Sequence, residues 1–374
     1  MHMTYIKPLD GLRAIAVLLV ISAHWIDSYN WLYYVQAGRL GVNLFFVLSG
    51  FLISTILFQH RDRAAAKKAS YKKLMWNFYL RRALRIFPIY YLLIFLMIAF
   101  QYPLHLELVR NQIVTALTYT SNFYVYSIGE WPANTGHFWS LAVEEQFYLI
   151  WPWLMVYLPR KFTLSCILLF IALSVTCRMF SSNYDLGYLF VFTCFDSLGL
   201  GALLAWLCLY RPALLQRLQP IFAAVAVVSS ILLLGFPGSA LILHQTRLFH
   251  SIIGFWLISF IVSNKSKRIF FTSLLSSKPM AAIGKISYGL YLYHIFVGAQ
   301  TEHLLNKLFG PAKNPATTAH YLTYLLIKFL VLLCVCAVSW KYVEKPLLRL
   351  KQYFDYDRRD AKPASVIEPS LQSA

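Results

Sequence analysis

The feature that most constrains this chain is a series of long apolar stretches separated by shorter polar connections. A helix of about 20 apolar residues crosses the hydrocarbon core of a bilayer, and lipid offers no partner for unpaired backbone groups. We therefore predict an all-α, polytopic membrane protein with about ten transmembrane helices. The predicted spans are 8–28, 39–58, 85–102, 139–158, 162–180, 187–208, 219–236, 241–263, 280–300 and 320–340.

Composition agrees with this fold class and argues against a soluble protein. Hydrophobic residues make up 59% of the 374 positions, charged residues only 13%, and the mean hydropathy is +0.57. Soluble domains carry about a quarter charged residues. We predict one transmembrane domain over 1–350 and a short polar tail, 351–374, that is disordered and cytoplasmic.

The net charge of +19 is distributed in a way that indicates a membrane topology and not nucleic-acid binding. With the N-terminus in the cytoplasm, most Lys and Arg fall in cytoplasmic connections, above all in 59–85. The far-side connections 103–136 and 301–319 hold only Arg110, Lys307 and Lys313. This asymmetry predicts a multi-pass protein of the inner (plasma) membrane with both termini in the cytoplasm. It also suits anionic membrane lipids and an anionic cytoplasmic ligand.

The first apolar stretch carries two ionisable residues, Arg13 and His24, eleven positions apart. Eleven helical steps return to nearly the same face, about 16 Å further along the axis. An arginine near a helix end is explained by snorkelling alone. A histidine deeper on the same stripe is not, and histidine moves protons at neutral pH. The spacing favours a functional pair over a structural one.

Two arginines in FYLRRALRIFP, Arg82 and Arg85, share a helix face at the predicted cytoplasmic start of the third span. Arginine forks bind phosphate oxygens in bidentate fashion, so the pair could hold the phosphates of a nucleotide-like molecule. Arginines at this position are also routine topology signals, and the sequence leaves both interpretations open.

In HFWSLAVEEQFYLIWP, the residues Ser140, Glu144 and Tyr148 recur every four positions and line one face, while Glu145 lies about 100° away. A carboxylate inside a span is costly unless it is paired. Glu144 could orient a histidine, act as a base or form an ion pair with an arginine.

In ISYGLYLYHIF, the side chains of Ser287, Tyr291 and His294 fall on one face. They could line a cavity or bond neighbouring helices together. The small residues of GRLGVNLFFVLSGFLIS predict close helix contacts, and Asn43 and Ser49 there could face a cavity. The aromatic stretch NQIVTALTYTSNFYVY is too short and polar for a span. The six cysteines show no metal-binding spacing, so we expect no metal.

Seven segments, taken together and in order, resemble the acyltransferase 3 family of integral membrane O-acyltransferases. They are LDGLRAIAVLLVISAHW, GRLGVNLFFVLSGFLIS, FYLRRALRIFPIYYL, HFWSLAVEEQFYLIWP, FDSLGLGALLA, KISYGLYLYHIF and KYVEKPLLR, which span residues 9 to 349. The resemblance implies ten helices and transfer of an acyl group, most often acetyl, from cytoplasmic acyl-CoA. The acceptor would be a hydroxyl of a glycan, a glycolipid or a similar molecule of the cell envelope.

The resemblance also implies site residues. Arg13 and His24 match the basic residue and the histidine of the family's first span, Arg82 and Arg85 its paired arginines, and Glu144 its carboxylate. Position 43 departs from the pattern, because it is Asn where the family often has Asp. Many relatives carry a second, extracytoplasmic domain, so a hand-off of the acyl group here would need a separate partner.

These observations lead to one mechanistic hypothesis and one alternative. Arg82, Arg85 and Arg13 bind acetyl-CoA, and Arg13 also belongs to the catalytic group. His24 is the general base or transiently accepts the acyl group, and Glu144 orients His24 or shares its proton. Ser140, Ser287, Tyr291 and His294 contact the substrate. The alternative is a polytopic transporter or flippase of glycolipids, since buried His, Glu and Arg also suit proton coupling. The sequence lacks the inverted repeats typical of such transporters.

Overall fold

The structure is a computed structural model that describes residues 5–26, 36–67, 70–101, 110–181, 187–265, 267, 269–310 and 318–354. Every secondary-structure element in these ranges is helical, which confirms the predicted all-α class. The ten longest helices are α1 Pro8–Trp25, α3 Ala37–Lys67, α4 Tyr71–Phe100, α7 Phe138–Tyr157, α8 Arg160–Met179, α9 Phe195–Tyr210, α11 Gln219–Gly235, α12 Ala240–Ser263, α15 Ser287–Phe309 and α16 Thr318–Ser339.

Shorter helical elements connect or extend these. They are α5 Arg110–Leu117, α6 Ser121–Ile128, α10 Pro212–Arg217, α13 Phe270–Leu275, α14 Lys278–Lys285 and α17 Lys345–Arg349, the 3-10 turns η1 Phe192–Cys194 and η3 Leu350–Phe354, and the π-helical turn η2 Trp340–Glu344. The stretch NQIVTALTYTSNFYVY thus forms two eight-residue helices, α5 and α6, and not a span.

Within the described residues, seven helical stretches are long and apolar enough to cross a membrane. They are built on α1, α3, α4, α8, α9, α12 and α16. The three remaining predicted spans fall on α7, α11 and α15. Helix α11 has only 17 residues, and α7 contains two glutamates. The architecture is that of a polytopic membrane protein, and crossing by these last three helices stays a prediction.

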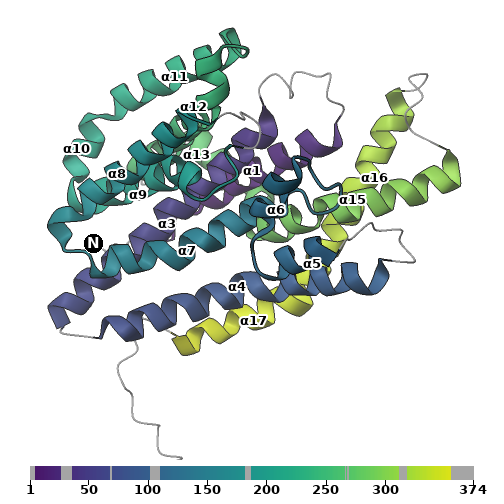
Figure 1. Cartoon of the computed structure of the whole chain (residues 1–374), viewed down its shortest axis with the longest axis horizontal. Coiled ribbons are helices and arrows are strands. Elements are labelled where there is room, and N and C mark those ends of the chain that lie inside the picture. Colours follow the sequence, from purple (N-terminus) through teal and green to yellow (C-terminus); the bar gives the residue numbers. More distant parts are fainter. Residues whose placement is uncertain are drawn as a thin grey trace, which may run out of the picture.

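Helix α1 occupies the middle of the bundle (Figure 1). It packs against α3 along one side and against α13, α14 and α15 along the other. Its buried side chains, among them Leu12, Val17 and Val20, form part of one continuous apolar core. Of the ionisable residues of this helix, Asp10 is buried and Arg13 partly buried, whereas His24 near its end is exposed.

The tightest long contact in the bundle joins α3 to α9. A Cβ at Gly50 of α3 would lie 2.0 Å from the carbonyl oxygen of Leu198 on α9, so only glycine fits there. Small residues let helix backbones approach closely in membranes, where dispersion contacts replace the hydrophobic effect between helices. This confirms the predicted role of the small residues in GRLGVNLFFVLSGFLIS.

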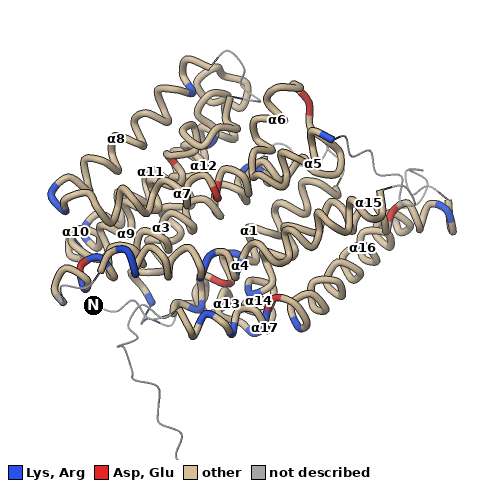
Figure 2. The backbone as a smooth tube through the Cα atoms, turned by 60° about the horizontal axis from the view of Figure 1, so that its bottom comes forward, with Lys and Arg blue, Asp and Glu red and all other residues tan. Residues whose placement is uncertain are grey.

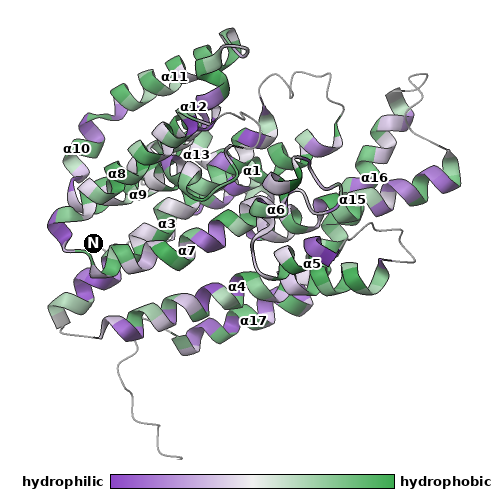
Figure 3. Cartoon of the chain, in the orientation of Figure 1, coloured by the Kyte–Doolittle hydropathy of each residue, from purple (hydrophilic) through white to green (hydrophobic). Residues whose placement is uncertain are grey.

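Hydrophobic residues dominate along the helices of the bundle, as on α11 (Figure 3). Large hydrophobic side chains such as Leu149, Trp153, Ile221 and Leu326 are exposed there. Lys and Arg gather instead along one side of the molecule, at the ends of α3, α4 and α10 and on α13, α14 and α17 (Figure 2). A lipid-facing apolar surface with basic residues at one end is the pattern expected of a membrane protein.

Several helix boundaries differ from the predicted spans. Helix α1 ends at Trp25, which places His24 near the end of the helix and not in its middle. Helix α4 starts at Tyr71 and not near residue 85. The prediction followed only the apolar stretch, whereas the basic segment before it is also helical. The predicted span 280–300 is broken at Ile286, where α14 gives way to α15.

The predicted disordered tail is only partly described. Residues 351–354 continue the chain as the turn η3, and the Arg81 guanidinium on α4 donates to the carbonyl oxygens of Lys351 and Phe354. Residues 355–374 lie outside the described residues.

Candidate active site

A cavity of about 240 Å³ opens between α1, α3, α4, α7 and α15. Three arginines, two glutamates and several hydroxyl groups line it together with apolar side chains. The polar and aromatic-hydroxyl residues are Arg13, Ser49, Arg82, Arg85, Ser140, Glu144, Glu145, Tyr148, Ser287, Tyr288 and Tyr291. Seven of the nine site residues predicted from the sequence are among them.

The arginines come from two helices. Arg13 of α1 forms an ion pair with Asp10 one turn earlier, at 2.6 Å, and the Tyr5 hydroxyl also donates to that carboxylate. Arg82 of α4 lies over the Tyr148 ring, 5.0 Å from its centroid. Among the described residues, neither Arg82 nor Arg85 forms an ion pair. The cavity therefore presents two guanidinium groups that have no ion-pair partner among the described residues and could bind an anion.

The two glutamates have different surroundings. Glu144 accepts a hydrogen bond from the Ser49 hydroxyl at 2.8 Å, and Tyr148 in turn donates to Ser49 at 3.3 Å. Glu145 also lines the cavity, although the helical spacing predicts another direction for it, and its buried Oε1 has no partner. An unpaired carboxylate oxygen in a buried, arginine-rich cavity is a group that a bound molecule can satisfy.

The remaining two predicted residues, His24 and His294, do not line this cavity but lie against each other. His24 Nδ1 is 3.3 Å from His294 Nε2, and the ring centroids are 4.9 Å apart. His24 Nδ1 is also 2.8 Å from the Val20 carbonyl oxygen, and His294 Nδ1 is 2.6 Å from that of Tyr291. Because a carbonyl only accepts, both Nδ1 atoms carry the proton in the neutral rings. The Nε2 of His24 is then unprotonated, as a general base requires.

Helix α1 is fixed at this point by Trp25. The Trp25 indole donates to the His294 carbonyl oxygen at 3.2 Å, and Tyr321 of α16 donates to the Trp25 carbonyl oxygen at 3.2 Å. A Cβ at Gly298 would lie 2.6 Å from the indole nitrogen, so glycine is needed for the indole to fit against α15. These contacts hold His24 beside His294.

A third histidine, His137, completes this group and has no counterpart among the residues predicted from the sequence. Its ring centroid is 5.1 Å from that of His294, and its Nε2 donates to the Leu292 carbonyl oxygen at 3.0 Å. Its Nδ1 is buried without a partner. The sequence did contain a signal for this residue. His137 stands three residues, or about one helical turn, before Ser140, the first residue of the predicted polar face.

Tyr291 joins the cavity to the histidines. Its hydroxyl lines the cavity, contacts Ser140, and donates to the His137 carbonyl oxygen at 3.3 Å. The predicted direct contact between Glu144 and His24 is absent from the described residues. His24 is instead oriented by its contacts with the Val20 carbonyl oxygen and with His294. Glu144 accepts its hydrogen bond from Ser49.

The predicted cavity role of Asn43 is also not met. Asn43 accepts from Ser197 at 3.2 Å within a buried cluster between α3 and α9, whereas Ser49, two turns further along α3, lines the cavity. The site thus combines a basic cavity with an adjacent histidine group, and Tyr291 lies between them.

A family model for an acyltransferase domain, that of the acyltransferase 3 family, matches residues 6–341. The chain belongs to this family. The match covers all the helices that line the cavity and hold the histidines, so the whole site lies within the family's domain.

Curated relatives carry names from cell-wall chemistry. A putative peptidoglycan O-acetyltransferase of Bacillus subtilis, YrhL, is 29% identical over 96% of this chain and 57% of its own length. The O-acetyltransferase OatA of Staphylococcus aureus is 28% identical over 92% and 57%. The peptidoglycan O-acetyltransferase OatA of Listeria monocytogenes is 27% identical over 92% and 56%. The chain thus spans somewhat more than half the length of these relatives. No solved structure matches it.

Proposed function

We propose that this acyltransferase 3 protein moves an acetyl group from cytoplasmic acetyl-CoA to a hydroxyl of a cell-envelope glycan or glycolipid. The observation that carries the proposal is the pairing of an arginine-rich cavity with a histidine whose Nε2 is free to accept a proton. The arginine-rich cavity suits a polyanionic donor, and the histidine can deprotonate an acceptor hydroxyl.

The donor end of the site is the cavity. Arg82 and Arg85, with Arg13 opposite, bind the phosphates of acetyl-CoA, and the pantetheine arm extends toward Tyr291. Arg13 and His24 lie on one helix about 16 Å apart along its axis, which sets the distance between phosphate binding and chemistry. The basic residues on the same side of the molecule attract the donor before it binds.

The histidine end performs the transfer. The Nε2 of His24 takes the proton of the acceptor hydroxyl as its oxygen forms a bond to the acetyl carbon, and the carbon–sulfur bond breaks. The proton then passes to the CoA thiolate, which leaves as the free thiol, and the acceptor leaves as an O-acetyl ester. His294 stabilises the charged ring of His24 through their contact at 3.3 Å. Tyr291 and Ser140 are the nearest hydroxyl donors for the developing oxyanion.

Glu144 and Ser287 have supporting roles in this scheme. Glu144 balances the arginine charge and keeps Arg82 and Arg85 in place when the donor is absent, and Ser287 offers a hydroxyl to the donor or the acceptor. We place both termini in the cytoplasm, with the acceptor on the far side. That arrangement lets the acetyl group cross a membrane that acetyl-CoA itself does not cross. A separate envelope protein receives the group where the acceptor is remote.

The proposal predicts that His24→Gln abolishes transfer without affecting donor binding. The purified protein in nanodiscs is mixed with radiolabelled acetyl-CoA and peptidoglycan or glycolipid fractions, and both CoA release and label in the acceptor are measured. A lost general base lowers the transfer rate by about 100- to 10,000-fold. The dissociation constant of acetyl-CoA should change less than about twofold, because the phosphates bind in the cavity.

The matched control is His303→Gln, an exposed histidine further along α15, which should retain the activity of the wild type. Full activity of His24→Gln would remove His24 from the chemistry. If well-folded wild-type protein moves a glycolipid across the bilayer and forms no ester, a flippase replaces the acetyltransferase.

A further inference from the structure

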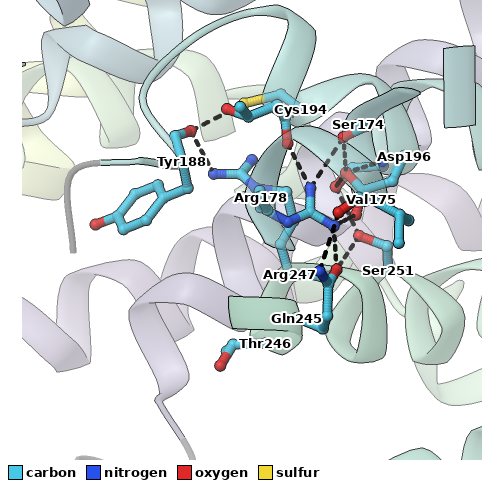
Figure 4. Close-up of polar contacts among 12 residues, drawn as sticks. Ser174, Val175, Arg178, Tyr188, Cys194, Asp196, Gln245, Thr246, Arg247 and Ser251 are labelled. Atoms are coloured by element: carbon cyan, nitrogen blue, oxygen red, sulfur yellow. Dashed lines mark hydrogen bonds and ion pairs between the residues drawn. The ribbon is translucent and has the colours of Figure 1, made fainter. Parts of the chain in front are cut away.

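Two buried arginines, Arg178 of α8 and Arg247 of α12, lie close together (Figure 4). They differ in how many of their N–H donors are hydrogen-bonded. Arg178 is fully bonded. Its Nη2 donates to Asp196 at 2.6 Å and to Gln245 at 2.9 Å, and its Nη1 and Nε donate to Ser174 and to backbone carbonyls. A buried ion pair with every donor satisfied is a structural feature of the bundle.

Arg247 is as deeply buried, with only 6% of its surface exposed, but almost unbonded. Its Nη2 donates to the Tyr188 carbonyl oxygen at 3.0 Å, whereas Nε and Nη1 have no acceptor. Among the described residues it forms no ion pair. An uncompensated guanidinium inside a membrane bundle is strongly unfavourable, so it marks a position where an anion belongs.

Aromatic rings surround this guanidinium. Its Cζ lies 5.2 Å from the ring centroid of Tyr188, 5.4 Å from Phe46 and 5.6 Å from Trp139. Trp131, which is 45% exposed, stacks on Tyr188 and leads from this group to the surface. Ring faces attract the cation but do not replace acceptors for its two open N–H groups.

Further basic side chains lie close to Arg247. The Arg39 guanidinium lies over the same Tyr188 ring, 5.1 Å from its centroid. His250 is one turn after Arg247 on the same face of α12, and its buried Nδ1 has no partner. Asp196, a buried carboxylate on α9, is bonded to Arg178 and so does not compensate Arg247. Arg247 thus has two open N–H donors for an anionic ligand, and the buried Nδ1 of His250 beside it also has no partner.

This group adjoins the active site. Phe46, whose ring lies against Arg247, also lines the catalytic cavity. Trp139 contacts Phe46 with ring centroids 6.0 Å apart, and the next residue, Ser140, lines the cavity. A molecule held by Arg247 would therefore be one aromatic ring away from the cavity.

We infer that Arg247, with Tyr188, Trp139 and Trp131, forms the binding site for the acceptor, and that this acceptor is a saccharide with an acidic substituent. The guanidinium binds the carboxylate or phosphate, and the aromatic rings pack against the sugar. The inference rests on the proposed function, because it identifies the acceptor of the same reaction. It assigns the acceptor to the end of the bundle opposite the basic connections.

The test compares Arg247→Met with Arg178→Met in nanodiscs. Loss of charged hydrogen bonds to a ligand in the first variant raises the acceptor KM by about 10- to 100-fold. Its melting temperature stays equal to that of the wild type or rises, since an uncompensated buried charge is removed. Arg178→Met leaves Asp196 unpaired, so its melting temperature falls. The acetyl-CoA dissociation constant is the same as in the wild type for Arg247→Met.

A second measurement needs no turnover. Tryptophan fluorescence reports binding of three probes to the wild-type protein: N-acetylmuramic acid, N-acetylglucosamine 1-phosphate and neutral N-acetylglucosamine. We expect one acidic sugar to bind at least about tenfold more tightly than the neutral one and to lose that advantage in Arg247→Met. Preference for the first probe identifies a sugar carboxylate, and preference for the second a phosphate-linked sugar.

The outcomes separate this inference from the proposed function. Equal binding of all three probes, or an Arg247→Met variant that is destabilised like Arg178→Met with an unchanged acceptor KM, overturns the acceptor site and leaves acetyl transfer standing. Absence of any ester from a wild-type protein that binds an acidic sugar through Arg247 overturns acetyl transfer instead.

Discussion

At the scale of single residues, the distinction between a structural and a functional charge depends on how completely its bonds are satisfied. Asp10 and Asp196 each have an arginine partner at 2.6 Å. Arg82 and Arg85 line a cavity and form no such pair among the described residues. The sequence predicts the two as either phosphate ligands or topology signals, and their position in the cavity favours the first interpretation.

Arg82→Gln and Arg85→Gln should each weaken acetyl-CoA binding by about tenfold or more, since a charge-assisted hydrogen bond contributes about 1.5–3 kcal/mol. The loss should be largest at low salt, because added salt screens the same interaction in the wild type. Isothermal titration calorimetry at two salt concentrations measures both effects.

The control for this prediction is Lys72→Gln, which removes one positive charge from an exposed position earlier on α4. If all three substitutions weaken acetyl-CoA binding equally, the arginines act only through the overall positive charge and not as specific phosphate ligands. An unchanged dissociation constant for Arg82→Gln and Arg85→Gln would place donor binding elsewhere.

The residues that sequence reasoning missed share a physical cause. His137, Glu145 and Arg247 belong to the site or adjoin it only because of how helices far apart in sequence meet. Helical spacing orders residues on one helix, as for Ser140, Glu144 and Tyr148, and these do line the cavity together. It says nothing of which backbone carbonyl or ring on another helix lies opposite.

At the scale of helices, catalytic geometry depends on where α1 ends against α15. The helix boundary at Trp25 differs from the predicted residue 28, and that difference changes the environment of His24. Instead of facing Glu144 in mid-span, His24 lies at the helix end beside His294. Hydrophobic stretches locate helices well, but their ends are set by caps and tertiary contacts that composition does not encode.

Gly298→Val should abolish transfer while leaving the donor site intact. Its Cβ would lie 2.6 Å from the Trp25 indole nitrogen, so the indole must move and lose its bond to the His294 carbonyl oxygen. His24 then separates from His294. Overpacking of this kind costs about 1–3 kcal/mol, enough to lower the melting temperature by a few degrees without unfolding the bundle.

Turnover and acetyl-CoA affinity, measured on the same preparation, test this prediction. The neighbouring Ala299→Val, at an exposed position of α15, serves as control and should behave as the wild type. Retained turnover in Gly298→Val would show that the position of Trp25 does not govern the histidines. Loss of donor binding as well would indicate a general collapse of the site.

At the scale of the whole molecule, the proposed transfer requires that the two ends of the bundle face different compartments. The basic residues gather on one side (Figure 2), at the same side as Arg82, Arg85 and the N-terminal end of α1. His24 and the group around Arg247 lie toward the other. Because positive residues favour the cytoplasmic side of a membrane, this charge distribution predicts which end of the bundle faces the cytoplasm. The fold class followed from the apolar stretches alone, whereas the orientation rests on this charge argument.

Single reporter cysteines can test that orientation. In a variant whose six native cysteines are replaced by serine or alanine, Lys72→Cys on α4 and Tyr126→Cys on α6 provide two exposed reporters. A membrane-impermeant maleimide should label Tyr126→Cys in intact cells and Lys72→Cys only after the membrane is opened. The background variant must retain acetyl transfer, so that the labelling describes the active form.

The reverse labelling pattern would show that the protein has the opposite orientation in the membrane. The arginine cavity would then face away from the pool of acetyl-CoA, and the donor site and the acceptor site could not both be as we assign them. Labelling of both reporters in intact cells would mean that α4, the long helix between them, does not cross the membrane as predicted. Because α4 contributes Arg82 and Arg85 to the cavity, this result would bear directly on how the site is built. Helix α7 falls outside the seven stretches that qualify by hydropathy. Its two partly buried glutamates are tolerable in a crossing helix only where arginines and hydroxyl groups face them, and Arg82, Arg85 and Ser49 supply these groups.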